Sequence, residues 1–189
     1  IPGLGDDVRY TKFLTRKWEK KYNIVPHVLT FGWQTNDTYE KRFEIIEEEL
    51  RSLNKRYGAI SILGISAGAS ASISLYCENK DKINKVICIC GRLNDQNVIQ
   101  RAYYPKKKIG SFKESIKICE QNVNKLSDKE KGKILTMSPI YDDVVPVRTM
   151  TIDGAVNRKI FAVQHMISIY LAMTLYSGSI AKFIKMGQL

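Results

Sequence analysis

A serine at the centre of a Gly-Ile-Ser-Ala-Gly segment, residues 64–68, is the first candidate for chemistry in this sequence. An apolar run, residues 59–64, precedes it, and residues 67–78 favour a helix. A tight strand-to-helix turn brings neighbouring backbone against the serine, so the positions two before and two after it must lack a bulky side chain. Gly64 and Gly68 meet that need. Ser66 is therefore a candidate nucleophile for attack on a carbonyl carbon; a phosphate-binding or purely structural turn is the alternative.

A serine nucleophile needs a base that takes its proton, and histidine most often fills that role. The sequence has two histidines. His27 lies in an early predicted strand, ahead of the serine segment, and we expect it to be packed or partly exposed. His165 follows the last predicted strand and is the candidate base. A hydrogen-bonded core histidine at the start of a helix is the alternative for His165.

A carboxylate must orient such an imidazole. The segment Asp142-Asp143-Val144-Val145-Pro146 follows a predicted strand, residues 133–137, and Asp95 follows another, residues 86–90. Any of these three aspartates is a candidate acid, and a turn or helix-capping role is the alternative.

Together, the Gly-x-Ser-x-Gly turn, the Asp-x-x-Val-Pro segment and the late histidine resemble the small esterases, lipases and acyl-protein thioesterase-like members of the α/β-hydrolase superfamily. The resemblance covers nearly the whole chain. It implies a triad of Ser66, Asp142 and His165, in that chain order, with Asp143 as the second choice of acid and Asp95 as the third. The sequence departs from the family at Gln164, where glycine often stands.

Acyl transfer also needs donors for the oxyanion. The backbone N–H of Ala67, next after the serine, is one candidate. The segment Pro2-Gly3-Leu4-Gly5 resembles the oxyanion turn of the family, which implies the N–H of Leu4 as the second; a flexible terminus is the alternative. The strand that normally leads into this turn is not seen. Trp33 is a candidate for lining the acyl pocket, with plain core packing as the alternative.

These residues need a framework that brings distant segments together. Apolar runs and β-branched residues predict strands at residues 26–31, 59–64, 86–90, 133–137 and 158–163. Helical spacing predicts helices at residues 37–57, 67–78, 111–123 and 165–184. Strands that alternate with helices predict an α/β fold with a mostly parallel, doubly wound sheet and helices on both faces. The resemblance implies a minimal α/β-hydrolase fold without a large lid, in one domain of residues 1–189.

The composition indicates which classes of binding partner to expect. Lys and Arg exceed Asp and Glu by 30 to 19, a net charge of +11, which favours acidic partners. No aromatic-interleaved basic motif is present, so nucleic acid is not expected as the main partner. We expect a small acyl ester as substrate, no cofactor and no metal. An anionic or interfacial substrate would meet the loop 92–110, through Tyr103, Tyr104 and Lys106 to Lys108.

Four cysteines, at positions 77, 88, 90 and 119, show no metal-ligand spacing and are expected to be free thiols. They suit a reducing interior, and no signal peptide or membrane span is expected, so we predict a cytoplasmic location. Two other functions remain open. One is a non-catalytic binding protein of the same fold. The other is a basic protein that binds anionic membrane or nucleic acid.

Overall fold

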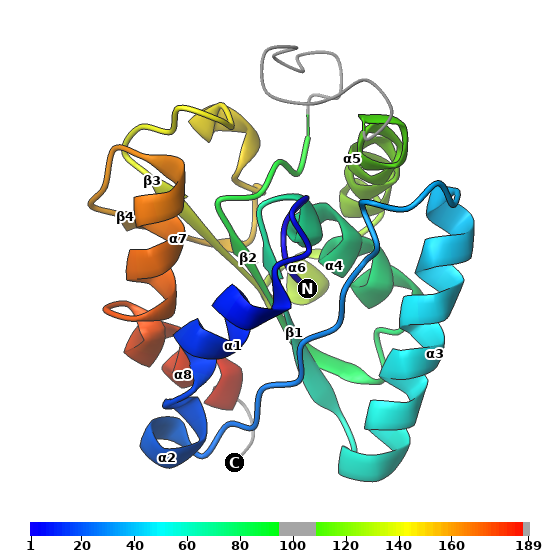
Figure 1. Cartoon of the computed structure of the whole chain (residues 1–189), viewed down its shortest axis with the longest axis horizontal. Helices are drawn as coiled ribbons and strands as arrows, with labels where there is room; N and C mark the ends of the chain where they lie inside the picture. Colours follow the sequence, from blue (N-terminus) through cyan, green and yellow to red (C-terminus); the bar gives the residue numbers. More distant parts are fainter. Residues whose placement is uncertain (95–108, 187–189) are drawn as a thin grey trace.

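A parallel sheet forms the centre of the computed structural model, which describes residues 1–94 and 109–186 (Figure 1). Within these residues the sheet has four strands, in the order β1 (Ile60–Ile65), β2 (Ile83–Ile89), β3 (Ile134–Pro139) and β4 (Val156–Ile160). All three neighbouring pairs run parallel. Parallel strands require crossover connections, which explains why helices follow β1 and β2. The predicted strand and helix alternation is confirmed.

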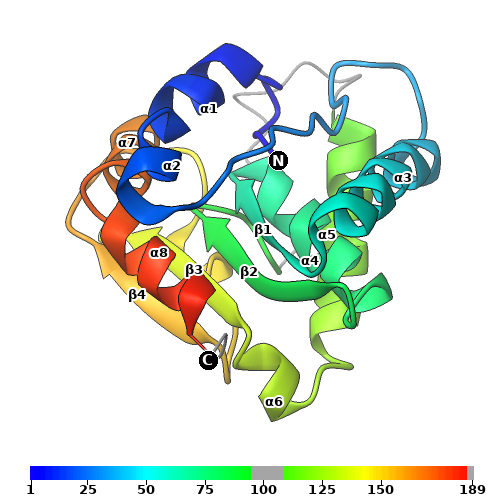
Figure 2. The same ribbon diagram turned by 90° about the horizontal axis from the view of Figure 1, so that it is seen from below.

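Helices cover both faces of this sheet, as Figure 2 shows. One face carries α3 (Tyr39–Tyr57), α4 (Ala67–Glu78) and α5 (Ile109–Val123). The other face carries α1 (Val8–Thr15), α2 (Trp18–Tyr22), α7 (His165–Met173) and α8 (Ser177–Lys185). Successive strand side chains point to opposite faces. In β2, Val86 and Cys88 therefore pack in the first layer, and Ile87 and Ile89 pack in the second.

Helix α4 packs tightly against β1, where small residues face one another. A Cβ atom on Gly64 of β1 would stand 2.4 Å from the carbonyl oxygen of Gly68 and 2.6 Å from the Cα of Ala69. The other side of the helix packs against α5, where the hydroxyls of Ser70 and Ser115 lie 2.7 Å apart. Gly64, two residues before the serine, therefore has to lack a side chain because β1 and α4 pack so closely there. This agrees with the prediction from the motif.

At the start of the chain, one sequence prediction is wrong and two helices were missed. Residues 26–31 form no strand and run as an extended segment beside β1, so the sheet ends at β1. Helices α1 and α2 precede that segment and were not predicted. Asp7 caps α1 by accepting a hydrogen bond from the N–H of Tyr10, at 2.9 Å.

Two predicted helices also have other bounds. The helix expected over residues 111–123 already includes Ile109 and Gly110 in the structure. The helix expected over residues 165–184 is two helices, α7 and α8, bent by 56°. None of the described helices is long and apolar enough to cross a membrane alone, although α7 and α8 together meet that length and composition. All four cysteines are free, as predicted.

A capping box that we did not predict opens the short helix α6 (Asp128–Lys131). The Glu130 carboxylate bonds to Lys80 at 2.7 Å and accepts the N–H of Ser127 at 2.7 Å. These contacts, with Lys80 the strongest, lower the pKa of Glu130 from 4.5 to about 2.

A folded pKa below the unfolded one adds stability above pH 4.5 that is lost as the pH falls towards 2. We therefore expect Glu130→Gln to melt at a lower temperature than the wild type at pH 6. At pH 2 the two proteins should melt at about the same temperature. Thermal unfolding followed by circular dichroism from pH 2 to pH 6 measures this difference. A gap between the two proteins that stays constant across this range contradicts the assignment.

Candidate active site

Ser66 occupies the sharp turn between β1 and α4. Its φ angle is +52° and its ψ angle −118°, a positive-φ conformation that serine rarely adopts and that costs about 1–3 kcal/mol. The surroundings hold it there: the N–H of Ser66 donates to the carbonyl of Ile89 at 2.8 Å, and its carbonyl accepts the N–H of Ala69 at 3.1 Å. The residue as a whole is half-buried.

His165 stands at the first position of α7, directly after the loop that follows β4. Its Nε2 lies 3.1 Å from the Oγ of Ser66, a distance at which the hydroxyl donates a hydrogen bond to a ring that carries its proton on Nδ1. The imidazole is almost completely buried. The chain separation of 99 residues is bridged only because β1 and β4 end at the same edge of the sheet.

Asp142 fixes that ring from the other side. Its Oδ2 lies 2.7 Å from the Nδ1 of His165. Its other oxygen, Oδ1, accepts the N–H groups of Val144 at 2.8 Å and Val145 at 2.7 Å. Each carboxylate oxygen therefore has its own donors, which fixes the carboxylate plane against the imidazole. The Asp-x-x-Val-Pro segment is an Asx-type turn that aims its first aspartate at His165.

Asp143, the second choice of acid, contacts the backbone of His165 instead of its ring. Its Oδ1 accepts the N–H of His165 at 2.9 Å, and Oδ2 accepts the side-chain amide of Gln164 at 3.4 Å. The His165 N–H bond is the main cause of a lowered pKa of Asp143. Gln164 also caps α7, because its Oε1 accepts the N–H of Ile167 at 2.8 Å. The departure from the family at Gln164 thus anchors the start of the helix that carries His165, a role that the sequence analysis missed.

One candidate acid and one candidate base remain. Asp95 is outside the described residues. His27 is exposed on the extended segment, with its ring 5.1 Å from that of Tyr57, and it lines a cavity that does not include Ser66.

The N-terminal turn packs directly against the serine. A Cβ on Gly3 would stand 3.0 Å from the Cβ of Ser66 and 3.5 Å from its Oγ. The turn is closed by the N–H of Asp6, which donates to the Gly3 carbonyl at 2.9 Å. The side-chain amide of Gln34 donates to the carbonyl of Leu4. The segment that contains Leu4 is therefore built into the site, and the role of its N–H, like that of the Ala67 N–H at the start of α4, stays a prediction.

Trp33 lies in the core. Its side chain is 3% exposed, stacks on Phe31 at 4.1 Å between ring centroids and meets Phe112 edge-on. Its indole N–H donates to the carbonyl of Pro2 at 3.4 Å. The burial favours the core alternative, with Trp33 supporting the turn beside Ser66 from behind.

Gly91, a glycine that the sequence analysis missed, follows β2 at the same edge of the sheet. A Cβ there would stand 2.1 Å from the Cβ of Ala69 and 2.9 Å from the carbonyl oxygen of Ser66. The sequence signal that could have identified it is a glycine two residues after the end of a buried parallel strand, next to the strand that bears the serine.

Gly68 holds the N-terminal turn in place, which gives a testable prediction. A Cβ at Gly68 would stand 2.3 Å from the carbonyl oxygen of Ile1 and 2.6 Å from that of Pro2, both backbone atoms. Gly68→Ala must therefore push the turn away from Ser66. If the turn supplies an oxyanion donor, kcat for ester hydrolysis falls by about 100-fold or more.

Gly5→Ala is the matched control, because nothing lies within 4 Å of a Cβ there. Steady-state kinetics on both variants measure the difference. Equal kcat values for the two variants, with Gly68→Ala folded, contradict the placement of the donor.

No family model matches this chain, and no curated protein matches it in sequence. Solved structures do match. One of two metagenome-derived lipolytic enzymes, LipS and LipT, aligns with a TM-score of 0.58 and 12% identity over 91% of this chain and 84% of the other. A meta-cleavage product hydrolase from Pseudomonas fluorescens IP01 aligns with a TM-score of 0.54 and 12% identity, over 79% of this chain and 72% of the other. A ferulic acid esterase aligns with a TM-score of 0.52 and 16% identity, over 73% of this chain and 58% of the other. These proteins share a fold with this chain at identities too low to transfer an activity.

Proposed function

The chain has the α/β-hydrolase fold, and on that premise we propose that it is a serine hydrolase that cleaves carboxylic esters or thioesters through an acyl-Ser66 intermediate. One observation carries the proposal. The hydroxyl of Ser66, the imidazole of His165 and the carboxylate of Asp142 form one hydrogen-bonded chain, with steps of 3.1 and 2.7 Å, at the carboxyl edge of the parallel sheet. That is the arrangement in which an imidazole, held in one tautomer, activates a hydroxyl.

The first half of the reaction forms a bond from Ser66 Oγ to the carbonyl carbon. His165 Nε2 takes the hydroxyl proton, and Asp142 stabilises the resulting imidazolium. The carbonyl oxygen becomes an oxyanion, which the N–H groups of Leu4 and Ala67 stabilise. When the tetrahedral species collapses, the bond to the leaving group breaks, and His165 returns the proton to that group.

Water completes the cycle. It attacks the acyl carbon while His165 Nε2 takes one of its protons, the bond from the carbon to Ser66 Oγ breaks, and the proton returns to Ser66. The products are a carboxylic acid and the free alcohol or thiol.

Apolar side chains beside the site support an apolar acyl group in the substrate. The loop after β3 and the loop after β4 run side by side, joined by the N–H of Ile140 to the carbonyl of Ala162 at 3.0 Å. From these loops Ile140, Tyr141, Phe161 and Val163 are all more than half exposed, next to Asp142 and His165 in the sequence. Apolar surface gathered at a catalytic edge favours contact with hydrocarbon. The residues expected to meet an anionic headgroup, Tyr103 and Tyr104 with the lysines after them, lie outside the described residues.

Hydrolysis of p-nitrophenyl esters from acetate to palmitate tests the proposal. We expect turnover of at least one ester, with kcat/KM rising from acetate to longer chains, and Phe161→Ser lowering the value for long chains more than that for acetate. Leu175→Ser is the matched control, because Leu175 is 73% exposed at the bend between α7 and α8. If every ester is hydrolysed no faster by the wild type than by Ser66→Ala, the proposed function is wrong.

A further inference from the structure

The two helical layers that cover the sheet differ in charge. Helices α3, α4 and α5, on one face, carry seven Lys and Arg and eight Glu. Residues 8–22 and 165–185, which form α1, α2, α7 and α8 with the turns that join them, carry eight Lys and Arg and one Glu (Figure 2). Much of the net charge of +11 therefore lies on one helical layer.

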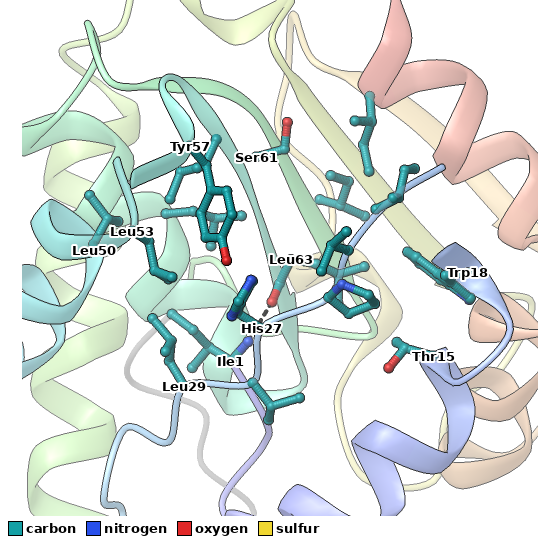
Figure 3. Close-up of a pocket in the computed structure, with 18 of the residues that line it drawn as sticks. Ile1, Thr15, Trp18, His27, Leu29, Leu50, Leu53, Tyr57, Ser61 and Leu63 are labelled. Carbon is teal, nitrogen blue, oxygen red and sulfur yellow. Dashed lines mark hydrogen bonds between the residues drawn. The ribbon is translucent and has the colours of Figure 1, made fainter. Parts of the chain in front are cut away.

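The cations of α1 and α2 are exposed because the inner sides of these helices are packed. Leu14 and Trp18 are buried, and the indole of Trp18 donates to the carbonyl of Met173 at 3.2 Å. Thr15 and Trp18 also line a cavity of about 410 Å³ beside β1 (Figure 3). The exposed cations of this segment are Arg9, Lys12, Arg16, Lys17, Lys20 and Lys21.

The neighbouring helix α7 contains no Lys, Arg, Asp or Glu. Met166, Ile167 and Tyr170 are about half exposed, and their spacing places them on one side of the helix. His165 is buried on the opposite side. A helix that is apolar on every side is ordinarily enclosed on every side, in protein or in lipid. The outer side of α7 is therefore an apolar surface that the described part of the chain leaves uncovered.

A hollow of about 270 Å³ joins the basic surface to the apolar one. Phe13 of α1 and Tyr170 of α7 both line it. Arg16, Lys17 and Lys21 line it too, and none of the described residues around it is acidic. The guanidinium of Arg16 lies over the Phe13 ring, 3.8 Å from the ring centroid. Cations set among apolar side chains suit an assembly of amphiphiles with anionic heads and hydrocarbon tails.

We propose that the α1–α7 face docks the protein on an anionic phospholipid bilayer. The cations of this face meet the negative potential of the lipid headgroups, and its apolar side chains reach the boundary with the acyl chains. Either attraction alone gives weak, reversible binding, and the two together hold a protein at a membrane. A nucleic acid would pair with the cations and leave the outer side of α7 uncovered, so a bilayer fits the whole face. The α1–α7 face consists of Phe13, Arg16, Lys17, Met166, Ile167 and Tyr170.

The α1–α7 face adjoins the candidate active site. Helix α7 begins at His165, whose Nε2 lies 3.1 Å from the Oγ of Ser66, and Met166 and Ile167 follow directly. A bilayer on this face would therefore lie next to the edge of the sheet that carries Ser66. On the proposed function, the acyl ester would then come from the lipid phase. The docking itself does not depend on that function.

Flotation with phospholipid vesicles tests the docking. Vesicles of phosphatidylcholine with about one phosphatidylglycerol in three lipids are compared with pure phosphatidylcholine, and the Ser66→Ala protein is used so that hydrolysis plays no part. We expect the partition coefficient to be about tenfold or more higher on the anionic vesicles. Raising NaCl from about 0.1 M to about 1 M, which shortens the screening length from about 10 to about 3 Å, should remove most of this gain. Equal partitioning onto the two kinds of vesicle overturns the proposal.

Paired charge variants locate the face. Arg16→Gln with Lys17→Gln removes two of its cations. Lys55→Gln with Arg56→Gln is the matched control, because these neighbours are exposed on α3 and Arg56 also lies over an aromatic ring, that of Tyr57, at 5.1 Å. We expect the first double variant to lower the partition coefficient by about tenfold and the control to change it by less than about twofold. Equal losses would assign the binding to net charge alone and overturn the proposal.

Ile167→Ser tests the apolar half of the face. Ile45→Ser is its matched control, because Ile45 is an exposed isoleucine on α3. We expect Ile167→Ser to weaken binding to the anionic vesicles by about threefold or more and Ile45→Ser to leave it unchanged, with circular dichroism confirming that both variants fold. Unchanged binding by Ile167→Ser overturns the proposal. Tighter binding to a DNA duplex than to the anionic vesicles also overturns it, because the cations would then serve a nucleic acid.

Discussion

Replacing Ser66 with alanine is expected to lower kcat for p-nitrophenyl ester hydrolysis by about 10⁵ to 10⁶-fold, with KM changed little. In the proposed mechanism this hydroxyl forms the acyl bond, and within the described residues it is the hydroxyl that lies 3.1 Å from Nε2 of His165. Steady-state kinetics with p-nitrophenyl esters measure the loss. Circular dichroism checks that the fold is retained.

Controls separate catalysis from folding. Ser52→Ala removes an exposed hydroxyl on α3 and should keep full activity. His165→Ala should lower kcat nearly as much as Ser66→Ala does. The double variant should lose no more than either single variant, because the effects of groups that act as one unit do not add. Losses that add for the two single variants would show that Ser66 and His165 act independently, against the proposed mechanism.

Asp142→Asn is expected to lower kcat by about 10⁴-fold. An asparagine amide can donate towards Nδ1 of His165, so it no longer selects the tautomer that leaves Nε2 free to accept the Ser66 proton. The two backbone donors of this turn, Val144 and Val145, can still bond to the amide oxygen, so the loop should survive. Kinetics against pH, with melting temperatures, measure the effect.

Asp143→Asn is the matched comparison, one residue away. Its oxygen accepts the backbone N–H of His165, and an amide oxygen can do the same. We expect a loss of about tenfold or less. A larger loss at Asp143 than at Asp142 would reverse the assignment of acid and anchor.

The framework of the site could be predicted because its signals are local. A buried strand, a glycine, a serine and a helix of small residues follow one another at residues 59–78, and the structure has β1, the turn and α4 there. The positions of the aspartates and of His165 after later strands place them at the same edge once the sheet is parallel. That logic predicts a shared location, and the distances of 3.1 and 2.7 Å come only from the structure.

Other features depend on contacts that no local pattern reveals. Residues 26–31 have the composition of a strand, but residues 26–29 lie across a cavity from β1, and no strand among the described residues pairs with the segment. Helices α1 and α2 are short, and they are held by tertiary contacts such as the indole of Trp18 donating to the carbonyl of Met173 at 3.2 Å. The 56° bend between α7 and α8 likewise has no signal in the composition, which predicts one continuous helix.

Labelling with a fluorophosphonate tests the central claim most directly, because the probe reacts with an activated serine hydroxyl and needs no knowledge of the substrate. We predict one adduct per chain, mapped by peptide mass spectrometry to Ser66, absent in Ser66→Ala and strongly slowed in His165→Ala. Equal labelling of the wild type and Ser66→Ala, or no labelling of a folded wild type, would contradict the account.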